Sequence, residues 1–465
     1  MRRLPVFLVL APLLLLGAGL VRSSPLAEVP GVVLQAIPAT LSRAQTDALD
    51  TLLRRAPSFP VRVGLLVTDA DSGQVLYTRA ADAAFPPASN MKLLSLTSLL
   101  SVLGPDYWFS TTVTRPRPSA APAQAAHLTL VGLGDPSLEQ SSGEHSLAGL
   151  ARQVYAHGVR RVADVWLDAH LIGGSAGHTQ NGQAIPGWTL PVVERPVVGL
   201  SLNDPSVGEG AELTAHPDAG AALLRAGRDF RAALQRAGVQ VTGKVEMAPT
   251  SAPPEEGIAT TRSAPLLQLA RYALKRSDNV WAEQLYARLG VNSQTPVWRA
   301  ATLEEASAQE LAFLKRAGAT AADLQALSLH DGSGLSESNR LTPAVLVRLL
   351  RYVYEHPFGS KLFPDAAFKA RQNPLIEALP RAGTGSATRA DRELGGTLAE
   401  RLKGLDVRAK TGTLPGVSSL SGYLTARSGR VLIFSMLMDG YPGPIQDLRQ
   451  LQDALLRILA ADLPG

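Results

Sequence analysis

The sequence predicts an α+β protein, in which an antiparallel sheet is flanked by helices and a mainly β domain is inserted into the chain. A strand–turn–strand pattern in residues 61–79 and three strand patterns in residues 405–439 stand at opposite ends of the chain, with helical patterns between them. Proline and glycine become frequent between residues 107 and 261, where long helical patterns are few. The two outer segments are therefore expected to form one sheet, and the middle segment a domain of its own.

The N-terminal segment, residues 1–24, has a basic start, a long apolar stretch and small polar residues at its end. This layout is typical of a secretory signal peptide, although the apolar run from Leu4 to Val21 is also long enough for a retained membrane anchor. Both alternatives predict an exported protein of the periplasm or cell envelope. The second leaves peripheral membrane association open.

The composition excludes several classes of function. A content of 45% hydrophobic and 18% charged residues is that of a globular protein, and the net charge of +5 is not clustered, so no nucleic-acid partner is predicted. The chain has no cysteine, which excludes disulfides, thiol catalysis and thiolate metal sites. No His-x-x-x-His pair occurs, and neither a metal nor another cofactor is predicted.

The first predicted domain comprises residues 25–106 and 262–465. It begins with a helical pattern in residues 40–55, followed by a hairpin of residues 61–68 and 74–79. The next helix follows residue 89 and is apolar on nearly every side, so it is expected to be buried.

The inserted domain, residues 107–261, has short strand patterns such as FSTTVTR, HLTLVGLG and VRRVADVWLD. After it, a helix pair in residues 262–290 is followed by further helical segments to about residue 377. Three strand patterns and a terminal helix with one apolar face complete the chain, which supplies the second half of the predicted antiparallel sheet.

Ser89 and Lys92 stand three residues apart where the buried helix is predicted to begin. Residues i and i+3 share one face of a helix, so the hydroxyl and the amine can meet. One interpretation is a helix cap followed by a solvated lysine, because serine is a favoured cap. The other is a nucleophile with its base: Lys92 is a lone charge among apolar residues, and desolvation beside a second cation lowers the pKa of a lysine.

Lys410 is the candidate for that second cation. It opens the only Lys-Thr-Gly of the chain, within Lys410-Thr411-Gly412-Thr413 on a predicted strand. Lysine and threonine on a strand edge can hold a carboxylate, and glycine lets a ligand backbone approach closely. The alternative is a strand with a solvated lysine.

A third motif, Ser277-Asp278-Asn279, lies between two helical patterns. Helix capping by Ser277 or Asp278 is the alternative interpretation, and residues 201–203 show the same Ser-x-Asn spacing. The three motifs together are far more specific than any one of them. Ser-x-x-Lys, Ser-Asp-Asn and Lys-Thr-Gly, in this order, are the signature of penicillin-binding proteins and class A β-lactamases.

On these motifs the chain resembles the D-alanyl-D-alanine carboxypeptidase/endopeptidase family, the class C low-molecular-mass penicillin-binding proteins. The segments PASNMKLL, LVGLGDPSL, DGSGLS and KTGTLPGVSSLSGYL carry the resemblance over most of the chain. It implies a penicillin-binding/serine β-lactamase-like transpeptidase domain that cleaves D-Ala-D-Ala, and in some members cross-link, bonds of peptidoglycan peptides and reacts with β-lactam antibiotics. The interval between Ser89 and Ser277 leaves room for an inserted domain that a β-lactamase lacks, and no Glu-x-x-Leu-Asn is present.

The resemblance implies a role for each motif residue. Ser89 attacks the carbonyl carbon, Lys92 takes its proton, and Ser277 relays a proton to the leaving amine. The N–H groups of Ser89 and Thr413 form the oxyanion hole, and Lys410 with Thr411 binds the terminal carboxylate. The implied substrate-binding residues are Asn279, Lys410, Thr411, Gly412, Thr413 and Asp168.

Asp168 has the weakest basis of these, and it belongs to the insert. In VWLDAH it matches an aspartate that faces the site in relatives, where it would bind a substrate amine; a structural aspartate at a strand end is the alternative. The insert is also shorter than the family's usual one, so the subdomain nested in it is expected to be reduced or missing. Glu337 stands after DGSGLS, where many members have an arginine.

Two other functions remain as alternatives. Residues 173–177 match the Gly-x-Ser-x-Gly elbow of esterases around Ser175, with His178 after it, but the following HTQNGQAIPGWTL does not suit the helix that this elbow needs. The other alternative is a catalytically silent cell-wall or β-lactam-binding protein that has kept the pocket. The presence of both a nucleophile and its base weighs against it.

Overall fold

The computed structural model describes residues 40–54, 61–117, 123–172, 179–180, 183–184, 189–190, 195–203, 219–249, 255–291, 300–356 and 373–461. The predicted signal peptide or anchor of residues 1–24 lies outside the described residues. In the part that is described, no helix combines the length and the apolar composition that crossing a bilayer requires.

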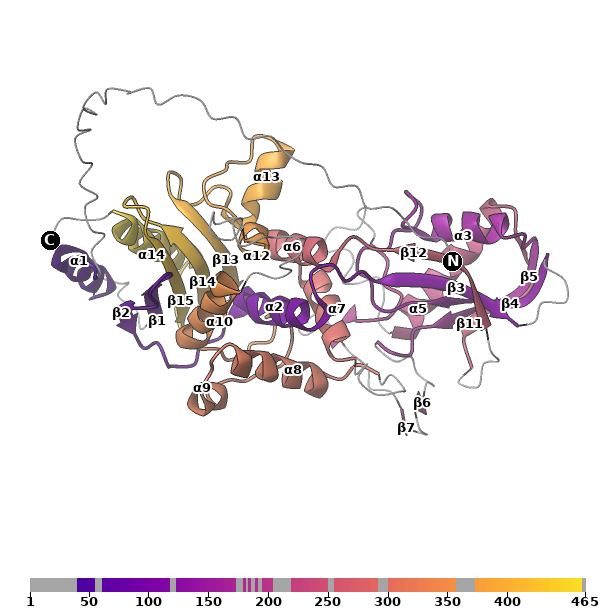
Figure 1. Cartoon of the computed structure of the whole chain (residues 1–465), viewed down its shortest axis with the longest axis horizontal. Coiled ribbons are helices and arrows are strands. Elements are labelled where there is room, and N and C mark those ends of the chain that lie inside the picture. Colours follow the sequence, from indigo (N-terminus) through magenta and orange to yellow (C-terminus); the bar gives the residue numbers. More distant parts are fainter. Residues whose placement is uncertain are drawn as a thin grey trace, which may run out of the picture. The chain divides into compact units, whose positions relative to one another are not determined.

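The two ends of the described chain form one five-stranded antiparallel sheet, as the sequence predicts (Figure 1). Its strand order is β13–β14–β15–β1–β2. The strands are β1 (Arg62–Asp69), β2 (Val75–Arg79), β13 (Asp406–Leu414), β14 (Val417–Thr425) and β15 (Val431–Asp439). β13, which carries Lys-Thr-Gly, is an edge strand, so one side of its backbone is not paired within the sheet.

Helices cover both faces of this sheet (Figure 1). α1 (Arg43–Arg54) and α14 (Ile445–Ala460) pack on one face, against alternate residues of β1 such as Val63, Leu65 and Val67. α10 (Pro343–Glu355) packs on the other face, where Leu66 belongs to a second apolar core. The period of two in β1 thus separates two cores.

The second core is built mainly from helices between the two ends of the chain. α2 (Met91–Leu103) contacts α6, α7 and α8 there. The remaining helices of this part are α6 (Leu266–Arg276), α7 (Asn279–Leu289), α8 (Leu303–Arg316), α9 (Ala321–Gln325), α12 (Pro374–Ala378), α13 (Arg389–Gly395) and the 3-10 turn η2 (Gly396–Leu398).

The start of α2 is anchored to the sheet. The 3-10 turn η1 (Ala88–Asn90) precedes α2, and every residue from Met91 to Leu100 is buried, which confirms the prediction of a buried helix. Asn90 stands at the N-cap without a side-chain cap bond. Its amide donates instead to the carbonyl of Lys410 at 3.1 Å and to Oγ of Ser419 at 2.6 Å. The helix start is therefore fixed against β13 and β14.

A second sheet belongs to the middle of the chain. It contains β3 (Ser110–Pro116), β4 (Gln124–Val131), β5 (Arg161–Asp168), β10 (Gln240–Val241), β11 (Val245–Met247) and β12 (Glu255–Arg262). Its order is β10–β5–β4–β3–β12, with β11 also paired to β5, and β4 and β5 run parallel. Two helices, α3 (Leu147–Ala156) and α5 (Ala219–Arg236), share a third apolar core with it. The predicted domain boundaries stay predictions.

Four two-residue strands form two further antiparallel pairs in this middle part. β6 (Thr179–Gln180) pairs with β7 (Gln183–Ala184), and β8 (Thr189–Leu190) pairs with β9 (Arg195–Pro196). Each pair forms its own small sheet, separate from the two larger ones.

Candidate active site

Ser89 lies in η1, and Lys92 lies one turn further on in α2. Nζ of Lys92 is 3.1 Å from Oγ of Ser89, 2.6 Å from Oδ1 of Asn279 and 2.6 Å from the carbonyl oxygen of Ser333. The exposed fraction of Lys92 is 0%, so the interpretation of a solvated lysine is wrong. The N-cap of α2 is Asn90, so Ser89 does not cap this helix.

The amine of Lys92 donates to three oxygens, which are Oγ of Ser89, Oδ1 of Asn279 and the carbonyl oxygen of Ser333. The oxygens of Asn279 and Ser333 only accept hydrogen bonds, so they orient the amine but have no proton to give it. The hydroxyl of Ser89 can also donate, so of these three partners it is the one from which Lys92, once deprotonated, can take a proton.

The backbone around Ser89 is held from two sides by segments that approach closely at glycines. A Cβ on Gly334, whose φ is +84°, would lie 1.9 Å from the carbonyl oxygen of Ala88. A Cβ on Gly412 would lie 2.9 Å from the nitrogen of Ser89. Ala88 itself has a φ of +46°, a conformation that costs a non-glycine residue roughly 1–3 kcal/mol and tends to occur at functional sites.

Ser277 stands between α6 and α7 in the left-handed conformation, with a φ of +60°. Nζ of Lys410 donates to Oγ of Ser277 and to the carbonyl of Thr411, both at 2.8 Å. Asp278 caps α7 by accepting from the N–H of Trp281 at 3.0 Å. The capping interpretation therefore holds for Asp278, whereas Ser277 turns its hydroxyl to Lys410.

Lys410 is the second cation that the motifs predict near Lys92. Its exposed fraction is 0%. Burial, and after it the charge of Lys92, holds the pKa of Lys410 well below its ordinary value. The amine of Lys410 therefore gives up its proton more readily than an exposed lysine does.

The outer edge of β13, on the side away from β14, lies beside η1 and Ser89. The N–H of Ala409 donates away from β14, to the carbonyl of Pro380 at 3.0 Å. Backbone groups alternate in an antiparallel strand, so the N–H groups of Thr411 and Thr413 point to the same outer edge. The N–H of Ser89 is in the first helical turn, where no intrahelical acceptor exists. The N–H groups of Ser89 and Thr413 can thus both donate to one oxyanion.

A cavity of about 400 Å³ opens in front of Ser89. It is lined by Ser89, Arg276, Ser277, Asn279, Thr397, Arg401, Thr411, Gly412, Thr413 and Arg449. Lys92 and Lys410 lie behind this lining, bonded to Ser89 and Ser277. The structure thus brings together every predicted site residue except Asp168.

Asp168 lies at the end of β5, in the second sheet. Its carboxylate bonds to Nδ1 of His170, and this hydrogen bond raises the pKa of His170. Its carbonyl accepts the N–H of Gly132 at 3.0 Å. Asp168 is not among the residues that line the cavity of Ser89, and its contact with a substrate amine stays a prediction.

Glu283 belongs to the site although it is part of none of the three sequence motifs. It is 1% exposed, and its Oε2 accepts the N–H groups of Gly332 at 3.1 Å and Ser333 at 2.9 Å. The carbonyl of Ser333 is the one that accepts from Lys92. The sequence contains one signal for Glu283: it follows Asn279 by four positions, so the two residues share one face of the helix.

Two other predictions concern metals and the esterase alternative. Within the described ranges, no group of three His, Asp or Glu side chains is placed to hold a metal ion. Ser175 and His178 of the Gly-x-Ser-x-Gly segment lie outside the described residues.

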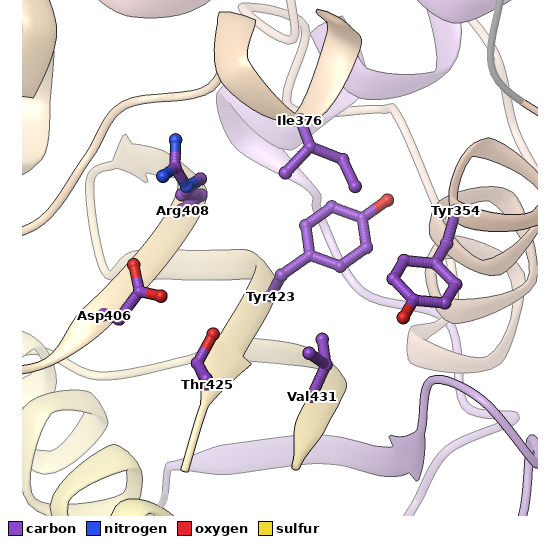
Figure 2. Close-up of a pocket in the computed structure, with 7 residues that line it drawn as sticks. All are labelled: Tyr354, Ile376, Asp406, Arg408, Tyr423, Thr425 and Val431. Carbon is purple, nitrogen blue, oxygen red and sulfur yellow. The ribbon is translucent and has the colours of Figure 1, made fainter. Parts of the chain in front are cut away.

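A second cavity, of about 60 Å³, is shown in Figure 2. It is lined by Tyr354, Ile376, Asp406, Arg408, Tyr423, Thr425 and Val431. The hydroxyl of Tyr423 donates to the carbonyl of Leu350 at 2.7 Å, and burial raises the pKa of Tyr423 well above its ordinary value. This volume holds a few water molecules at most and is too small for a peptide.

The fold and the site together define a class of protein. A Ser-x-x-Lys that opens a buried helix, a Ser-Asp-Asn between two helices and a Lys-Thr-Gly on the edge strand are the arrangement of the penicillin-recognising serine enzymes. The model of the D-Ala-D-Ala carboxypeptidase 3 (S13) family matches residues 45–183 and 205–462. The chain belongs to this family.

Individual relatives agree with the family match. A D-alanyl-D-alanine carboxypeptidase of an Actinomadura species is 29% identical over 508 residues, covering 94% of this chain and 86% of the relative. Carboxypeptidase DacB of Mycolicibacterium smegmatis is 30% identical over 444 residues, covering 92% and 87%. The crystal structure of penicillin binding protein 4 of Haemophilus influenzae superposes with a TM-score of 0.66 at 19% identity, covering 89% and 99%, and so shares the fold.

These findings confirm three predictions made from the sequence: the family, the penicillin-binding-protein fold and the enzyme class, a serine-type D-Ala-D-Ala carboxypeptidase.

Proposed function

We propose that this protein is an exported serine DD-carboxypeptidase that removes the terminal D-alanine of peptidoglycan peptides through an acyl-enzyme on Ser89. β-Lactam antibiotics would acylate the same serine. The observation that carries the proposal is the 3.1 Å contact between Nζ of Lys92 and Oγ of Ser89, beside a cavity bordered by the edge strand β13. The activities named for the Actinomadura and Mycolicibacterium relatives support the choice of substrate.

Acylation begins when Oγ of Ser89 attacks the carbonyl carbon between the two D-alanines, while its proton passes to the amine of Lys92. The N–H groups of Ser89 and Thr413 stabilise the oxyanion of the tetrahedral intermediate. The C–N bond then breaks, and the proton reaches the leaving nitrogen through the hydroxyl of Ser277. Asn279 keeps Lys92 oriented through its 2.6 Å contact.

Deacylation uses the same groups in reverse. A water molecule attacks the ester carbonyl and gives its proton to Lys92, the ester bond breaks, and the proton returns to Oγ of Ser89. Only side chains and backbone N–H groups take part in this scheme, so it requires no cofactor. The acyl-enzyme formed from a β-lactam would be hydrolysed more slowly. The leaving group of the opened ring stays attached to the acyl group and occupies the position from which water would attack the ester.

The same chemistry extends to cross-link bonds, in which a second peptide replaces the terminal D-alanine as the leaving group. Thr413, on the rim of the cavity, is exposed, so a longer leaving group has a way out to solvent. We include this endopeptidase activity in the proposal. Export rests on the N-terminal sequence pattern, and envelope location on the relatives' cell-wall activity.

The test is to label the purified protein with a fluorescent penicillin and to locate the adduct by mass spectrometry. The expected adduct is on Ser89, and Ser89→Ala should show none while keeping the thermal melting temperature of the wild type. The same preparations should release D-alanine from a pentapeptide only when Ser89 is present. An adduct on another residue would contradict the mechanism, and acylation without D-alanine release would support the silent binding protein instead.

A further inference from the structure

The cavity in front of Ser89 has a strongly positive lining. It includes three arginines, Arg276, Arg401 and Arg449, and among the residues that line it there is no aspartate or glutamate. Such a lining favours an anionic ligand, because opposite charges attract most strongly where low-dielectric walls exclude water. The three arginines differ in how far protein carboxylates neutralise their charge and solvent screens it.

Arg401 is already paired. Its Nη2 lies 2.6 Å from Oδ1 of Asp453, so this guanidinium is neutralised within the protein. Arg276 is exposed and lies over the ring of Tyr272, with 5.3 Å from its Cζ to the ring centroid. An exposed, screened charge of this kind contributes little to binding.

Arg449 is different. It is half-buried on α14, and its Nη2 donates to Oγ1 of Thr413 at 3.2 Å. Among the residues that the structure describes, no carboxylate lies within ion-pair distance of it. Thr413 and Thr411 have the same parity on β13, so their side chains leave the strand on the same face. Arg449 therefore lies beside Thr413 with a positive charge that no protein carboxylate among the described residues neutralises.

Lys410 is poorly placed to provide that charge. Its amine is fully buried and donates to Oγ of Ser277 and the carbonyl of Thr411. A guanidinium stays charged at every relevant pH and can form two parallel hydrogen bonds with a carboxylate.

We propose that Arg449 is the specificity-determining residue that binds the carboxylate of the leaving residue, together with the hydroxyls of Thr411 and Thr413. The enzyme would therefore select peptides in which the carboxylate next to the scissile bond is free. This inference rests on the proposed function and deepens it. In a cross-link whose leaving residue is joined through its α-amino group, the α-carboxylate of that residue lies next to the scissile bond, as it does in a terminal D-alanine. Amidation of this carboxylate would therefore protect both the D-Ala-D-Ala bond and the cross-link bond from cleavage.

The experiment compares a tripeptide ending in D-Ala-D-Ala with the same peptide ending in a carboxamide. In Arg449→Gln, kcat/KM for the free acid should fall about tenfold to a hundredfold, as expected for the loss of a charged hydrogen-bond partner, while kcat/KM for the carboxamide stays the same. Arg449→Lys should recover part of the preference. Arg457→Gln, an exposed arginine of the same helix, is the matched control and should leave both values unchanged.

A second pair of probes, benzylpenicillin and its methyl ester, measures the same preference through acylation of Ser89. An equal loss for acid and amide in Arg449→Gln, or no loss for the acid, would overturn this inference while the proposed function stands. If the wild type neither releases D-alanine nor is acylated, the proposed function fails and the inference falls with it.

Discussion

Lys92 and Lys275 are both buried lysines on helices of the same core, but their amines meet different partners. Lys92, on α2, contacts the hydroxyl of Ser89 at 3.1 Å at the edge of an open cavity. Lys275, on α6, is 4% exposed and donates to the backbone carbonyls of Leu379 and Leu394. The first amine faces a group that can give up a proton, and the second faces groups that only accept.

Burial alone therefore does not mark a catalytic lysine. Burial, and after it the charge of Arg271, lowers the pKa of Lys275 to about 7, a value that would suit a general base. Within the described part of the chain no nucleophile is bonded to the amine of Lys275, whose hydrogen bonds connect α6 to Leu379 and Leu394. The partner of the amine and access to a cavity decide its role, whereas a shifted pKa is found at structural sites as well.

The largest effect is expected for Lys92→Met, which keeps the length of the side chain but removes the amine. Acylation of Ser89 by penicillin should slow by about 10³-fold, because the hydroxyl loses its general base. The rate of adduct formation, followed by mass spectrometry, measures this. Lys275→Met is the matched control, since it removes the other buried amine without touching a hydroxyl.

An equal loss of acylation in Lys92→Met and Lys275→Met would contradict the comparison, because it would mean that loss of a buried amine damages the fold and not the chemistry. Thermal melting of both variants separates these cases.

A smaller effect is expected for Lys410→Met. The hydroxyl of Ser277 then loses its 2.8 Å partner, so proton delivery to the leaving nitrogen becomes less efficient. D-alanine release should slow by about 10²-fold, at the lower end for general acid–base catalysis. The loss should appear in kcat more than in KM, because in the proposed complex Arg449 and not Lys410 binds the carboxylate. A change confined to KM would return the carboxylate to Lys410.

Glu283→Gln should have a weaker effect. The amide keeps one acceptor oxygen for the N–H groups of Gly332 and Ser333 but loses the charge, and hydrogen bonds to charged groups contribute about 1.5–3 kcal/mol. The carbonyl of Ser333 would then be held less firmly against Lys92. We expect roughly tenfold slower acylation and a free energy of unfolding lower by about 1–3 kcal/mol, measured by urea denaturation. Slower acylation without any loss of stability would mean that Glu283 acts on the chemistry directly.

Much of the fold could be predicted because it depends on local patterns. Residues 61–79 and 405–439 hold short runs rich in strand-forming residues between turn signals, and the two ends pair as β1 with β15. The all-round apolar helix after Ser89 is the buried α2. The mixed strand directions of the second sheet were not predictable in this way, since neither period nor composition specifies which strand of the insert pairs with which.

The site residues also differ in whether a local sequence pattern identifies them. Ser89, Lys92 and Lys410 belong to short motifs, so the sequence identifies them. Glu283 and Arg449 belong to none of the three motifs, and their contacts reach residues 50 and 36 positions away in the chain. The helix face that Glu283 shares with Asn279 is a local signal for the first residue, but the sequence holds no comparable signal for Arg449. Asp168 was also identified by a motif, and its contact with a substrate stays a prediction; its carboxylate bonds to His170.

Lys275→Met should leave acylation close to that of the wild type and change the pH dependence of stability instead. The pKa of Lys275 is about 7 in the folded protein and about 10.4 in the unfolded chain, so between these values the unfolded state binds more protons. The stability cost of burying this amine therefore falls as the pH rises, by up to about 1.4 kcal/mol per pH unit. The free energy of unfolding of the wild type minus that of Lys275→Met should thus increase from pH 7 to pH 9. Lys315→Met, on an exposed lysine of α8, should give a difference that does not change with pH. A pH-independent difference for Lys275→Met as well would mean that the amine stays charged in the folded protein, and the contrast between the two buried lysines would then rest on their contacts alone.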